Sequence, residues 1–326
     1  MRRRQFLSLF GGIAAWPLNA RGQKAPMPVI GFLNSGTLTG REHFVAAFHE
    51  GLKEAGYING HNISVEYRWA NDRYDQLAAL AYDLVRLKVG VITATGSDAA
   101  ALAAKHATTT IPIVFGNSGD PVKTGLVGSL NRPGGNVTGV TFFTTTLASK
   151  RLELLRELVP NLHTIGVLTN PNNPSAELET KEVLAAANSV GQRVQILAAT
   201  TETGITSAFE ELAKQPGSAL LVNTDPYFLS HREQIVVLEN RHRLPTVHTI
   251  REWTVAGGLM SYGIKIADGY RQVAVYAGQI VKGANPADMP VLQPTRFEAV
   301  INLRTAKVLD LNIPQSMLLR ADEVID

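Results

Sequence analysis

A restart of the sequence pattern at a fixed offset constrains the fold of this chain more than any other feature. Val29-Ile-Gly-Phe-Leu33 predicts a buried strand, and Thr164-Ile-Gly-Val-Leu168 repeats it in the second half of the chain. Gly56 and Gly191, which each end the next predicted helix, are separated by the same offset as these two strands. Strands alternate with helices after both starts, which predicts an α/β fold with parallel sheets. The repeat favours two Rossmann-like lobes of similar topology over one large doubly wound sheet.

The length and charge of the chain exclude several classes of protein. A chain of 326 residues is too long for one simple core and suits two domains of ordinary size. The formal net charge of +3 arises at the N-terminus, because residues 1–22 contain four arginines and no acidic residue. The remainder has 27 basic and 28 acidic residues, so no basic surplus is left to bind nucleic acid. The absence of cysteine excludes disulfides, thiolate nucleophiles and cysteine-based metal sites.

Residues 1–22 have the layout of a secretory signal peptide. Arginines at positions 2–4 form a charged start, an apolar stretch runs to about Leu18, and small polar residues follow. The pair Arg3-Arg4 resembles a twin-arginine signal, although the general secretory route stays open. The apolar stretch of about 13 residues is shorter than the ~20 needed to span a bilayer. We therefore expect export to the periplasm, with cleavage near Gly22.

Small hydroxyl and amide side chains follow the predicted strands at the point where each strand ends. In open α/β sheets, ligands bind outside the carboxyl ends of the strands, so these loops are predicted to line a cleft. Asp120 before Pro121 is also a typical helix start and predicts a helix over Val122–Leu130. The same residue types serve any strand-to-helix turn, so capping alone is an alternative for each loop. The candidate ligand-binding residues are Asn34, Ser35, Thr95, Ser97, Asn117, Ser118, Asp120, Asn170, Asn173, Thr224 and Asp225.

Two tyrosines complete the candidate set. Tyr227 follows a predicted strand end, and Tyr262 lies in Gly258-Leu-Met-Ser-Tyr-Gly263, with Trp253 just upstream. Aromatic rings supply much contact area to a ligand at low entropic cost, although core packing is an equally good expectation for each. The backbone N–H groups at the predicted helix starts favour an anion such as a carboxylate.

The motifs of common catalytic and metal sites are absent from the sequence. It contains no Gly-x-Ser-x-Gly elbow, no Gly-rich loop that ends in Gly-Lys-Ser or Gly-Lys-Thr, and no Gly-x-Gly-x-x-Gly. Its eight histidines form no His-Glu-x-x-His pair, and a proline lies between His242 and His248. We expect a protein that binds a small molecule without catalysing a reaction and that holds no metal or cofactor.

Several stretches carry a likeness to a known family. They include Gly119-Asp-Pro-Val-x-x-Gly-Leu-Val127, Ser129-Leu-Asn-Arg-Pro-Gly-Gly-Asn-Val-Thr-Gly139 and, near the end, Val300-Ile-Asn-Leu-Arg-Thr-Ala-Lys307. With these stretches the chain resembles the ABC-transporter substrate-binding family with the type I periplasmic binding fold, over nearly the whole mature chain. The resemblance implies two lobes joined by a multi-strand hinge, which close on a small solute and then dock with a membrane permease. Some relatives look like aromatic amino-acid binders, which implies an amino acid or another small carboxylate as ligand.

The resemblance also implies how the chain divides. We expect residues 27–145 and about 248–285 in the N-terminal lobe, and residues 146–247 and about 286–326 in the C-terminal lobe. The ligand would contact both lobes only when they close, so its binding would drive closure of a monomer. A periplasmic sensor that presents its solute to a membrane receptor is the alternative. A transcription regulator with the same fold would need a helix-turn-helix where this chain has its signal peptide.

Overall fold

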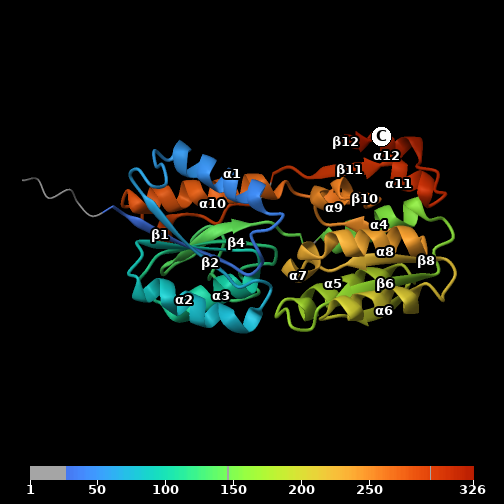
Figure 1. Ribbon diagram of the computed structural model, residues 1–326, viewed down its shortest axis with the longest axis horizontal. Coiled ribbons are helices and arrows are strands. Elements are labelled where there is room, and N and C mark those ends of the chain that lie inside the picture. Colours follow the sequence, from blue (N-terminus) through green and yellow to red (C-terminus); the bar gives the residue numbers. More distant parts are fainter. Residues whose placement is uncertain (1–26, 145–146, 294) are drawn as a thin grey trace, which may run out of the picture.

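The computed structural model describes residues 27–144, 147–293 and 295–326, which form two lobes side by side along the longest axis (Figure 1). Each lobe is built on a β-sheet with helices on both faces. The predicted signal peptide, residues 1–22, lies outside the described residues. Within the described ranges, no helix is both long and apolar enough to cross a membrane.

The first lobe contains a five-stranded parallel sheet in the order β2-β1-β3-β4-β5. Helices cover both faces of this sheet, α1 and α10 on one side and α2 and α3 on the other (Figure 1). The strands are β1 (Val29–Asn34), β2 (Ser64–Trp69), β3 (Val91–Thr95), β4 (Ile113–Asn117) and β5 (Val137–Thr141). The helices are α1 (Glu42–Glu54), η1 (Tyr74–Gln76), α2 (Leu77–Arg86), α3 (Asp98–Ala107) and α10 (Ile266–Val281), and the 3-10 turn η3 (Pro286–Asp288) follows α10.

Packing in the first lobe follows directly from the sequence pattern. On α1, Phe44, Phe48 and Leu52 recur every four residues, so they share one face, and all three are buried. Gly51 lets α1 approach α10 closely, because a Cβ atom at this position would collide with the carbonyl oxygen of Arg271. Helix α10 belongs to the last third of the chain, so this contact joins the lobe across a long sequence separation.

The second lobe contains the repeat predicted from the sequence. Strand β6 begins at Thr164, the repeat of Val29, and occupies the same place among its neighbours as β1 does, in the order β7-β6-β8. The sheet continues past β8, because Leu220 N donates a hydrogen bond of 2.9 Å to Pro245 O just before β9. The strands are β6 (Thr164–Thr169), β7 (Arg193–Ala198), β8 (Ser218–Val222), β9 (Val247–His248), β10 (Met260–Gly263), β11 (Glu298–Asn302) and β12 (Glu323–Ile325). The helices are α4 (Ala148–Leu158), α5 (Ala176–Ser189), α6 (Glu202–Leu212), α7 (Pro226–Ser230), α8 (Arg232–His242), α9 (Arg251–Val255), α11 (Leu303–Val308) and α12 (Gln315–Leu318).

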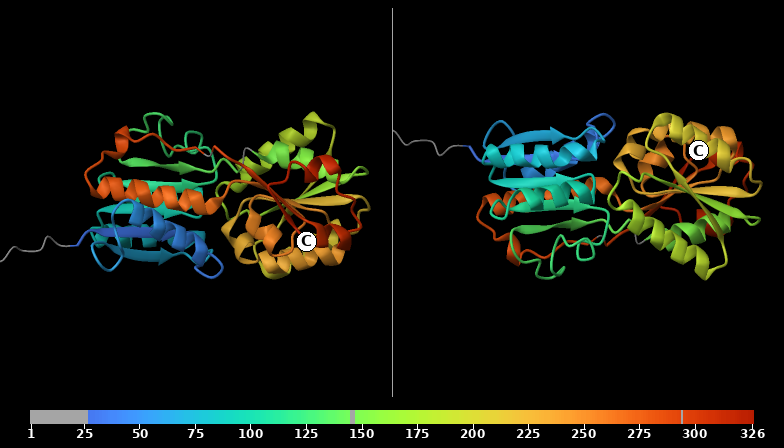
Figure 2. Two further views of the ribbon diagram at one scale, coloured as in Figure 1. Left: turned by 90° about the horizontal axis from the view of Figure 1, so that it is seen from above. Right: turned by 90° about the horizontal axis from the view of Figure 1, so that it is seen from below.

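The chain passes to the second lobe after β5, returns to the first after β10 and crosses again before β11 (Figure 2). Strand β10 leads out of the second lobe and β11 leads back into it. They therefore pair antiparallel, with Met260 opposite Ile301. This antiparallel pair is the point where the second sheet departs from the expected all-parallel arrangement.

The structure places residues 248–263 differently from the expected division of the chain. Strand β10 pairs with β9 and β11, and Leu259 and Met260 pack in the core of the second lobe. Helix α10 and the segment up to Leu292 lie in the first lobe, where Leu292 N donates a hydrogen bond of 2.9 Å to Gly139 O. The returning segment is therefore 264–292 rather than about 248–285. The reason is that β9 and β10 extend the second sheet before the chain crosses.

The helix predicted over Val122–Leu130 is also wrong, because the structure forms turns there. Leu126 N and Val127 N both donate to Pro121 O, which closes a tight turn instead of continuing a helical ladder. Gly125 has a φ of +73°, in the left-handed region that interrupts a right-handed helix.

Candidate functional site

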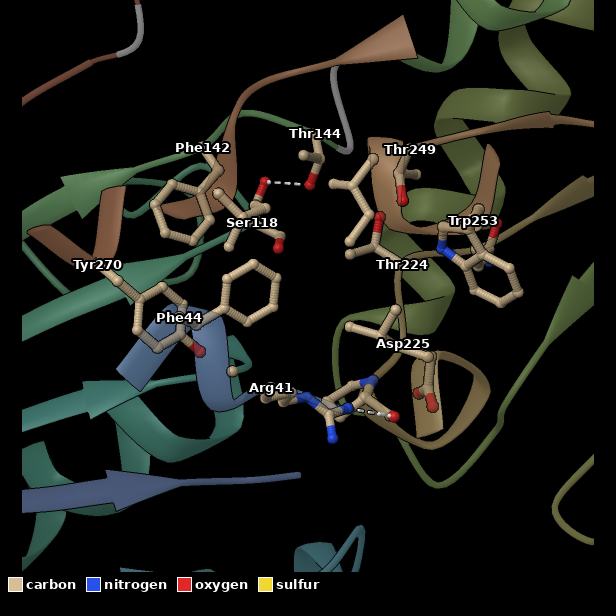
Figure 3. Close-up of a pocket in the computed structure, with 16 residues that line it drawn as sticks. Arg41, Phe44, Ser118, Phe142, Thr144, Thr224, Asp225, Thr249, Trp253 and Tyr270 are labelled. Carbon is tan, nitrogen blue, oxygen red and sulfur yellow. Dashed lines mark hydrogen bonds between the residues drawn. The ribbon is translucent and has the colours of Figure 1, made fainter. Parts of the chain in front are cut away.

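A cavity lies between the two lobes, at the carboxyl ends of their strands (Figure 3). Its empty space is about 600 Å³, including the part that opens to solvent. Its walls come from α1, α10 and the ends of β4 and β5 in the first lobe, and from α9 and the end of β8 in the second. Both halves of the repeat therefore contribute to one site, and a concave site between two lobes suits a small molecule.

Aromatic side chains form walls on both sides of the cavity. From the first lobe, Phe44 stacks on Tyr270 with ring centroids 5.2 Å apart, and Phe142 lies beside them (Figure 3). From the second lobe, Trp253 faces the cavity and stacks on the buried His248, with centroids 4.5 Å apart and planes within 4°. The cavity is therefore lined from both lobes by aromatic rings that packing holds in place, which suits a flat apolar ligand group.

Hydroxyl groups line another side of the cavity. Ser118, Thr144, Thr224 and Thr249 come from the end of β4, the crossing after β5, the end of β8 and the segment after β9. Thr144 Oγ1 donates to the carbonyl oxygen of Ser118 at 3.5 Å, as the dashed line in Figure 3 marks. These groups offer hydrogen-bond partners from both lobes to a polar part of a ligand.

Arg41 places a positive charge at the edge of the cavity. Its guanidinium donates to Thr37 O within the first lobe, and to Pro226 O at 2.8 Å and Ser230 Oγ at 3.0 Å in the second. The side chain is only 3% exposed and forms no ion pair with any described residue. Burial lowers the pKa of Arg41, and the Coulomb attraction of Asp72 partly offsets this. A buried guanidinium without an ion-pair partner favours an anionic group in the adjoining cavity.

The position of Arg41 is not explained by local helix stability. It occupies the N-cap of α1, where a positive charge lies at the positive end of the helix dipole and its side chain makes no capping hydrogen bond. Gly36 makes room for the guanidinium, because a Cβ atom there would lie 2.6 Å from Arg41 Cζ. Both features indicate that this arginine is placed for the cavity and the opposite lobe.

Further hydrogen bonds join the lobes around the cavity. Tyr74 OH donates to Asp225 Oδ2 at 2.8 Å, and His43 Nε2 lies 3.0 Å from Glu252 Oε1. Together with the bonds from Arg41, these contacts require the lobes to be close together. The structure therefore represents the closed arrangement of the two lobes.

Asp225 joins several parts of the closed site. Its carboxylate caps α7 through Tyr227 N and Phe228 N, and it also accepts hydrogen bonds from Asn170, Asn173 and Tyr74. Burial raises the pKa of Asp225 to about 6, although these hydrogen bonds favour the charged form. With its oxygens already engaged, Asp225 holds the two lobes and the α7 cap in place.

The structure brings three of the residues predicted from the sequence, Ser118, Thr224 and Asp225, into the lining of the cavity. Seven others are buried near it without forming the lining: Asn34, Ser35, Thr95, Ser97, Asn117, Asn170 and Asn173. Asn34 shows their role, because its amide donates to Thr95 Oγ1 at 2.8 Å and to Tyr270 OH at 3.0 Å. Asn34 thus supports Tyr270, and Asn170 and Asn173 support Asp225 in the same way, by hydrogen bonds to a residue that lines the cavity.

Three predicted residues lie elsewhere. Asp120 accepts hydrogen bonds from Val122 N and Lys123 N and shapes the turn at this position. Tyr227 lies in a separate groove, where its ring packs at a tilt of 38° against His231, with centroids 4.2 Å apart. Tyr262 lies on β10 and stacks on Phe297 beside the hinge, with centroids 6.1 Å apart.

Several residues of the cavity were not predicted as ligand contacts. Phe44 lies on the apolar face of α1, and its spacing with Phe48 indicates core packing just as well. Tyr270 and Ile266 come from α10, which joins the first lobe only in three dimensions. The sequence offered one local signal for these residues. Arg41 lies at the start of a predicted helix, where a positive charge is unfavourable for the helix and indicates another role. The described residues hold no cluster of three or more His, Asp or Glu side chains suited to a metal ion.

Comparison with known proteins agrees with this architecture. The family described as ABC transporter substrate binding protein matches residues 35–325. A tyrosine-binding protein of Clostridioides difficile is 28% identical over 268 residues, which cover 81% of this chain and 75% of that protein.

Solved structures give the same picture. A conserved domain protein of Vibrio cholerae has a TM-score of 0.85 at 26% identity, covering 91% of this chain and 99% of the other. The ABC domain from Streptococcus pneumonia in complex with L-Trp has a TM-score of 0.82, with the same identity and coverage. The ligand-free, open structure of a substrate-binding protein from Clostridium difficile reaches only 0.65 at 25% identity, with the same coverage. This lower value is consistent with the closed arrangement described above. Because the family match spans nearly the whole described chain, this protein belongs to the ABC transporter substrate-binding protein family.

Proposed function

We propose that the mature chain is the extracytoplasmic solute-binding component of an ABC uptake transporter, and that it captures an aromatic L-amino acid without chemical turnover. The signal-peptide layout of residues 1–22 supports export to the periplasm. The tyrosine-binding relative and the relative solved with L-Trp support the class of ligand. An inner-membrane permease would then receive the solute from the closed protein.

The observation that carries the proposal is the combination of aromatic walls with one buried cation. Phe44 and Tyr270 on one side and Trp253 on the other form a slot for an aromatic ring. Arg41 supplies a buried positive charge at the edge of the same cavity, within reach of a ligand carboxylate. The hydroxyl groups of Thr224 and Thr249 offer acceptors for an ammonium group. An aromatic amino acid has a ring, a carboxylate and an ammonium group, which match these three parts of the cavity in turn.

Closure couples binding to the shape of the protein. Phe44 and Trp253 belong to different lobes, so a ligand touches both rings only when the cleft is shut. Its additional contacts in the closed form shift the hinge equilibrium towards that form. The closed protein would present a surface different from that of the open protein, which a permease can distinguish.

The proposal is tested by thermal unfolding and calorimetry of the mature chain from Gln23, after denaturation and refolding to remove bound ligand. L-tryptophan, L-tyrosine and L-phenylalanine are compared with tryptamine and tyramine, which lack the carboxylate, and with L-leucine, which lacks the ring. A ligand at 100 times its dissociation constant stabilises by about 2.7 kcal/mol, which raises the melting temperature by several degrees. We expect this rise with at least one aromatic amino acid, and a much smaller one with the amines and L-leucine.

An equal rise with tryptamine would contradict the assignment of a carboxylate to Arg41. No rise with any aromatic amino acid would overturn the proposed class of ligand. For the uptake role, loss of accumulation of the bound amino acid in cells that lack the gene is the expected result.

A further inference from the structure

The two threonines of the cavity at positions 144 and 224 are connected from behind by a buried ion pair. Arg151 on α4 and Glu179 on α5 are 3% and 1% exposed, with Nη2 and Oε1 3.4 Å apart. Arg151 Nη1 donates to Thr144 O at 2.8 Å. Glu179 accepts from Thr224 N at 2.8 Å and from Thr224 Oγ1 at 3.1 Å. A continuous chain of polar contacts thus runs from Thr144 to Thr224 through the interior of the second lobe.

This series of polar contacts ends at Thr144, between the two lobes, and at Thr224, in a loop that faces the ligand site. Thr144 lies in the crossing after β5, which is one of the segments that join the two lobes. Thr224 directly precedes Asp225, which caps α7 and contacts Tyr74 of the first lobe. Both threonines line the cavity. The ion pair therefore holds one hinge segment and one ligand-facing loop in a fixed relation.

Stability alone does not account for this pair. Burying two charges carries a large desolvation cost, and well-packed apolar residues in their place are often as stable or more stable. Burial lowers the pKa of Arg151 and raises that of Glu179, so it disfavours the charged form of each, and the attraction between the two charges offsets part of this cost. Apolar residues could not donate to Thr144 O as Arg151 does, nor accept from Thr224 N and Thr224 Oγ1 as Glu179 does.

We infer that Arg151 and Glu179 are a positioning pair that couples the hinge crossing at Thr144 to the cavity loop at Thr224, and so sets both the open–closed balance and the ligand affinity. Neither side chain lines the cavity, so both act through the threonines. Closure fixes the backbone at Thr144, and the pair transmits that position to the loop that faces the ligand. The inference rests on the proposed function for its ligand, but its effect on the hinge can be measured without one.

The test replaces both charges at once, in Arg151→Met/Glu179→Leu, so that no unpaired charge is left buried. Because the chain contains no cysteine, Tyr82→Cys on α2 and Val237→Cys on α8 give one spin label on each lobe, at exposed positions. The distance distribution between the labels is recorded without ligand and with saturating L-tryptophan. Calorimetry gives the dissociation constant, and thermal unfolding gives the stability of each variant.

We expect the double variant to fold with a melting temperature close to that of the parent, to show a broader distance distribution shifted towards the open form, and to bind about tenfold more weakly. The matched control is Glu157→Leu/Arg320→Met. It removes an ion pair of 2.7 Å between α4 and the turn after α12, away from the cavity, and should change neither affinity nor distance.

Parental affinity and an unchanged distance distribution in a folded double variant would overturn the inference and leave the pair a purely structural role. If the double variant does not fold, Arg151→Lys decides the question. Its lysine keeps the charge but cannot reproduce the two-pronged contact to Thr144 O and Glu179, so weaker binding at an unchanged melting temperature is expected. If the parent binds no aromatic amino acid, the proposed function fails, and the distance distribution without ligand still tests the pair.

Discussion

The carboxylate of Asp98 in the first lobe accepts a hydrogen bond of 2.8 Å from the hydroxyl group of Ser175 in the second. Asp98 Oδ1 also accepts a hydrogen bond of 3.2 Å from Gly119 N. One carboxylate oxygen is therefore bonded within its own lobe, and the other is bonded to the opposite lobe across the cleft. Burial raises the pKa of Asp98, while the hydrogen bond from Ser175 acts in the opposite direction. The contact exists only when the lobes are closed, and it compensates part of the cost of burying Asp98 on closure.

Ser175→Ala is expected to weaken ligand binding by about tenfold, because a hydrogen bond to a charged group contributes ~1.5–3 kcal/mol and this one is made only in the closed form. The melting temperature without ligand should change little, since Ser175 makes no side-chain cap on α5. Calorimetry with L-tryptophan, a ligand of the proposed class, measures the loss of affinity. Ser189→Ala, at the other end of α5, removes an exposed hydroxyl bonded to Ala186 O and is the matched control. Equal affinity in the two variants would show that the bond across the cleft does not favour closure.

Asp225 predicts a specific pH dependence of stability. Its pKa is raised from 3.8 to about 6 by burial, so the folded state holds the proton more tightly than the unfolded state does. The contribution of Asp225 to the free energy of unfolding is therefore fully present below about pH 3.8 and is lost as the pH rises through about 6. The expected loss is on the order of 2–3 kcal/mol, from ~1.4 kcal/mol per pKa unit.

The measurement is urea unfolding of the parent and of Asp225→Asn between pH 4 and pH 7.5. Asparagine also caps helices well, so the variant should keep the start of α7 while it removes the titrating group. The difference in unfolding free energy between the two proteins should change across this window, in favour of the variant at higher pH. A constant difference would show that Asp225 has an ordinary pKa in the folded protein.

Much of the architecture follows from local sequence patterns. The repeat at Val29 and Thr164 predicts the two sheets, and the structure confirms it, because buried parallel strands need continuous apolar runs. Local patterns do not show to which lobe each segment after residue 247 belongs. β9 and β10 have two and four residues, too few to show a periodicity, and their lobe is decided by pairing with distant strands such as β8 and β11.

The site was predictable where it depends on strand ends and unpredictable where it depends on helix faces. Ser118 and Thr224 follow β4 and β8, and parallel strands bring such ends to one edge of a sheet. Phe44 and Tyr270 lie on apolar helix faces, where a ring that faces a cavity has the same spacing as one that faces the core. Only the packing of α10 against α1 brings these two rings together beside the cleft.

Trp253 should report ligand binding through its fluorescence. The sequence contains three tryptophans, of which Trp69 and Trp253 remain in the protein from Gln23 that is used for the binding test, and Trp253 lines the cavity. Trp69 packs on Phe32 in the first lobe, with ring centroids 5.4 Å apart. We expect Trp69→Phe to keep the change in emission on binding of L-phenylalanine, and Trp253→Phe to abolish it. The opposite pattern would place the ligand away from the cavity between the lobes.

Gly51→Ala should destabilise the protein although alanine is the better helix former. A Cβ atom at position 51 would collide with the carbonyl oxygen of Arg271, so α1 and α10 would have to separate. Overpacking of this kind costs about 1–3 kcal/mol, which urea unfolding would detect. Gly128→Ala is the control, because the nearest atom to its Cβ would be 3.8 Å away, and its effect should stay within about 0.5 kcal/mol. Similar costs for the two variants would show that the α1–α10 contact can relax.

Arg41→Gln separates recognition of a carboxylate from simple closure of the cleft. Loss of the bonds to Pro226 O and Ser230 Oγ should weaken every ligand to the same extent, because those bonds stabilise the closed form whatever is bound. Loss of a charge that contacts the ligand should weaken L-tryptophan by about a further tenfold relative to tryptamine. Calorimetry with both ligands gives this ratio. Arg68→Gln, which removes a guanidinium paired with Asp83 in the same lobe, should leave the ratio unchanged. An equal loss for the two ligands in Arg41→Gln would make Arg41 a contact between the lobes alone, and the ligand carboxylate would then have to bind elsewhere in the cavity.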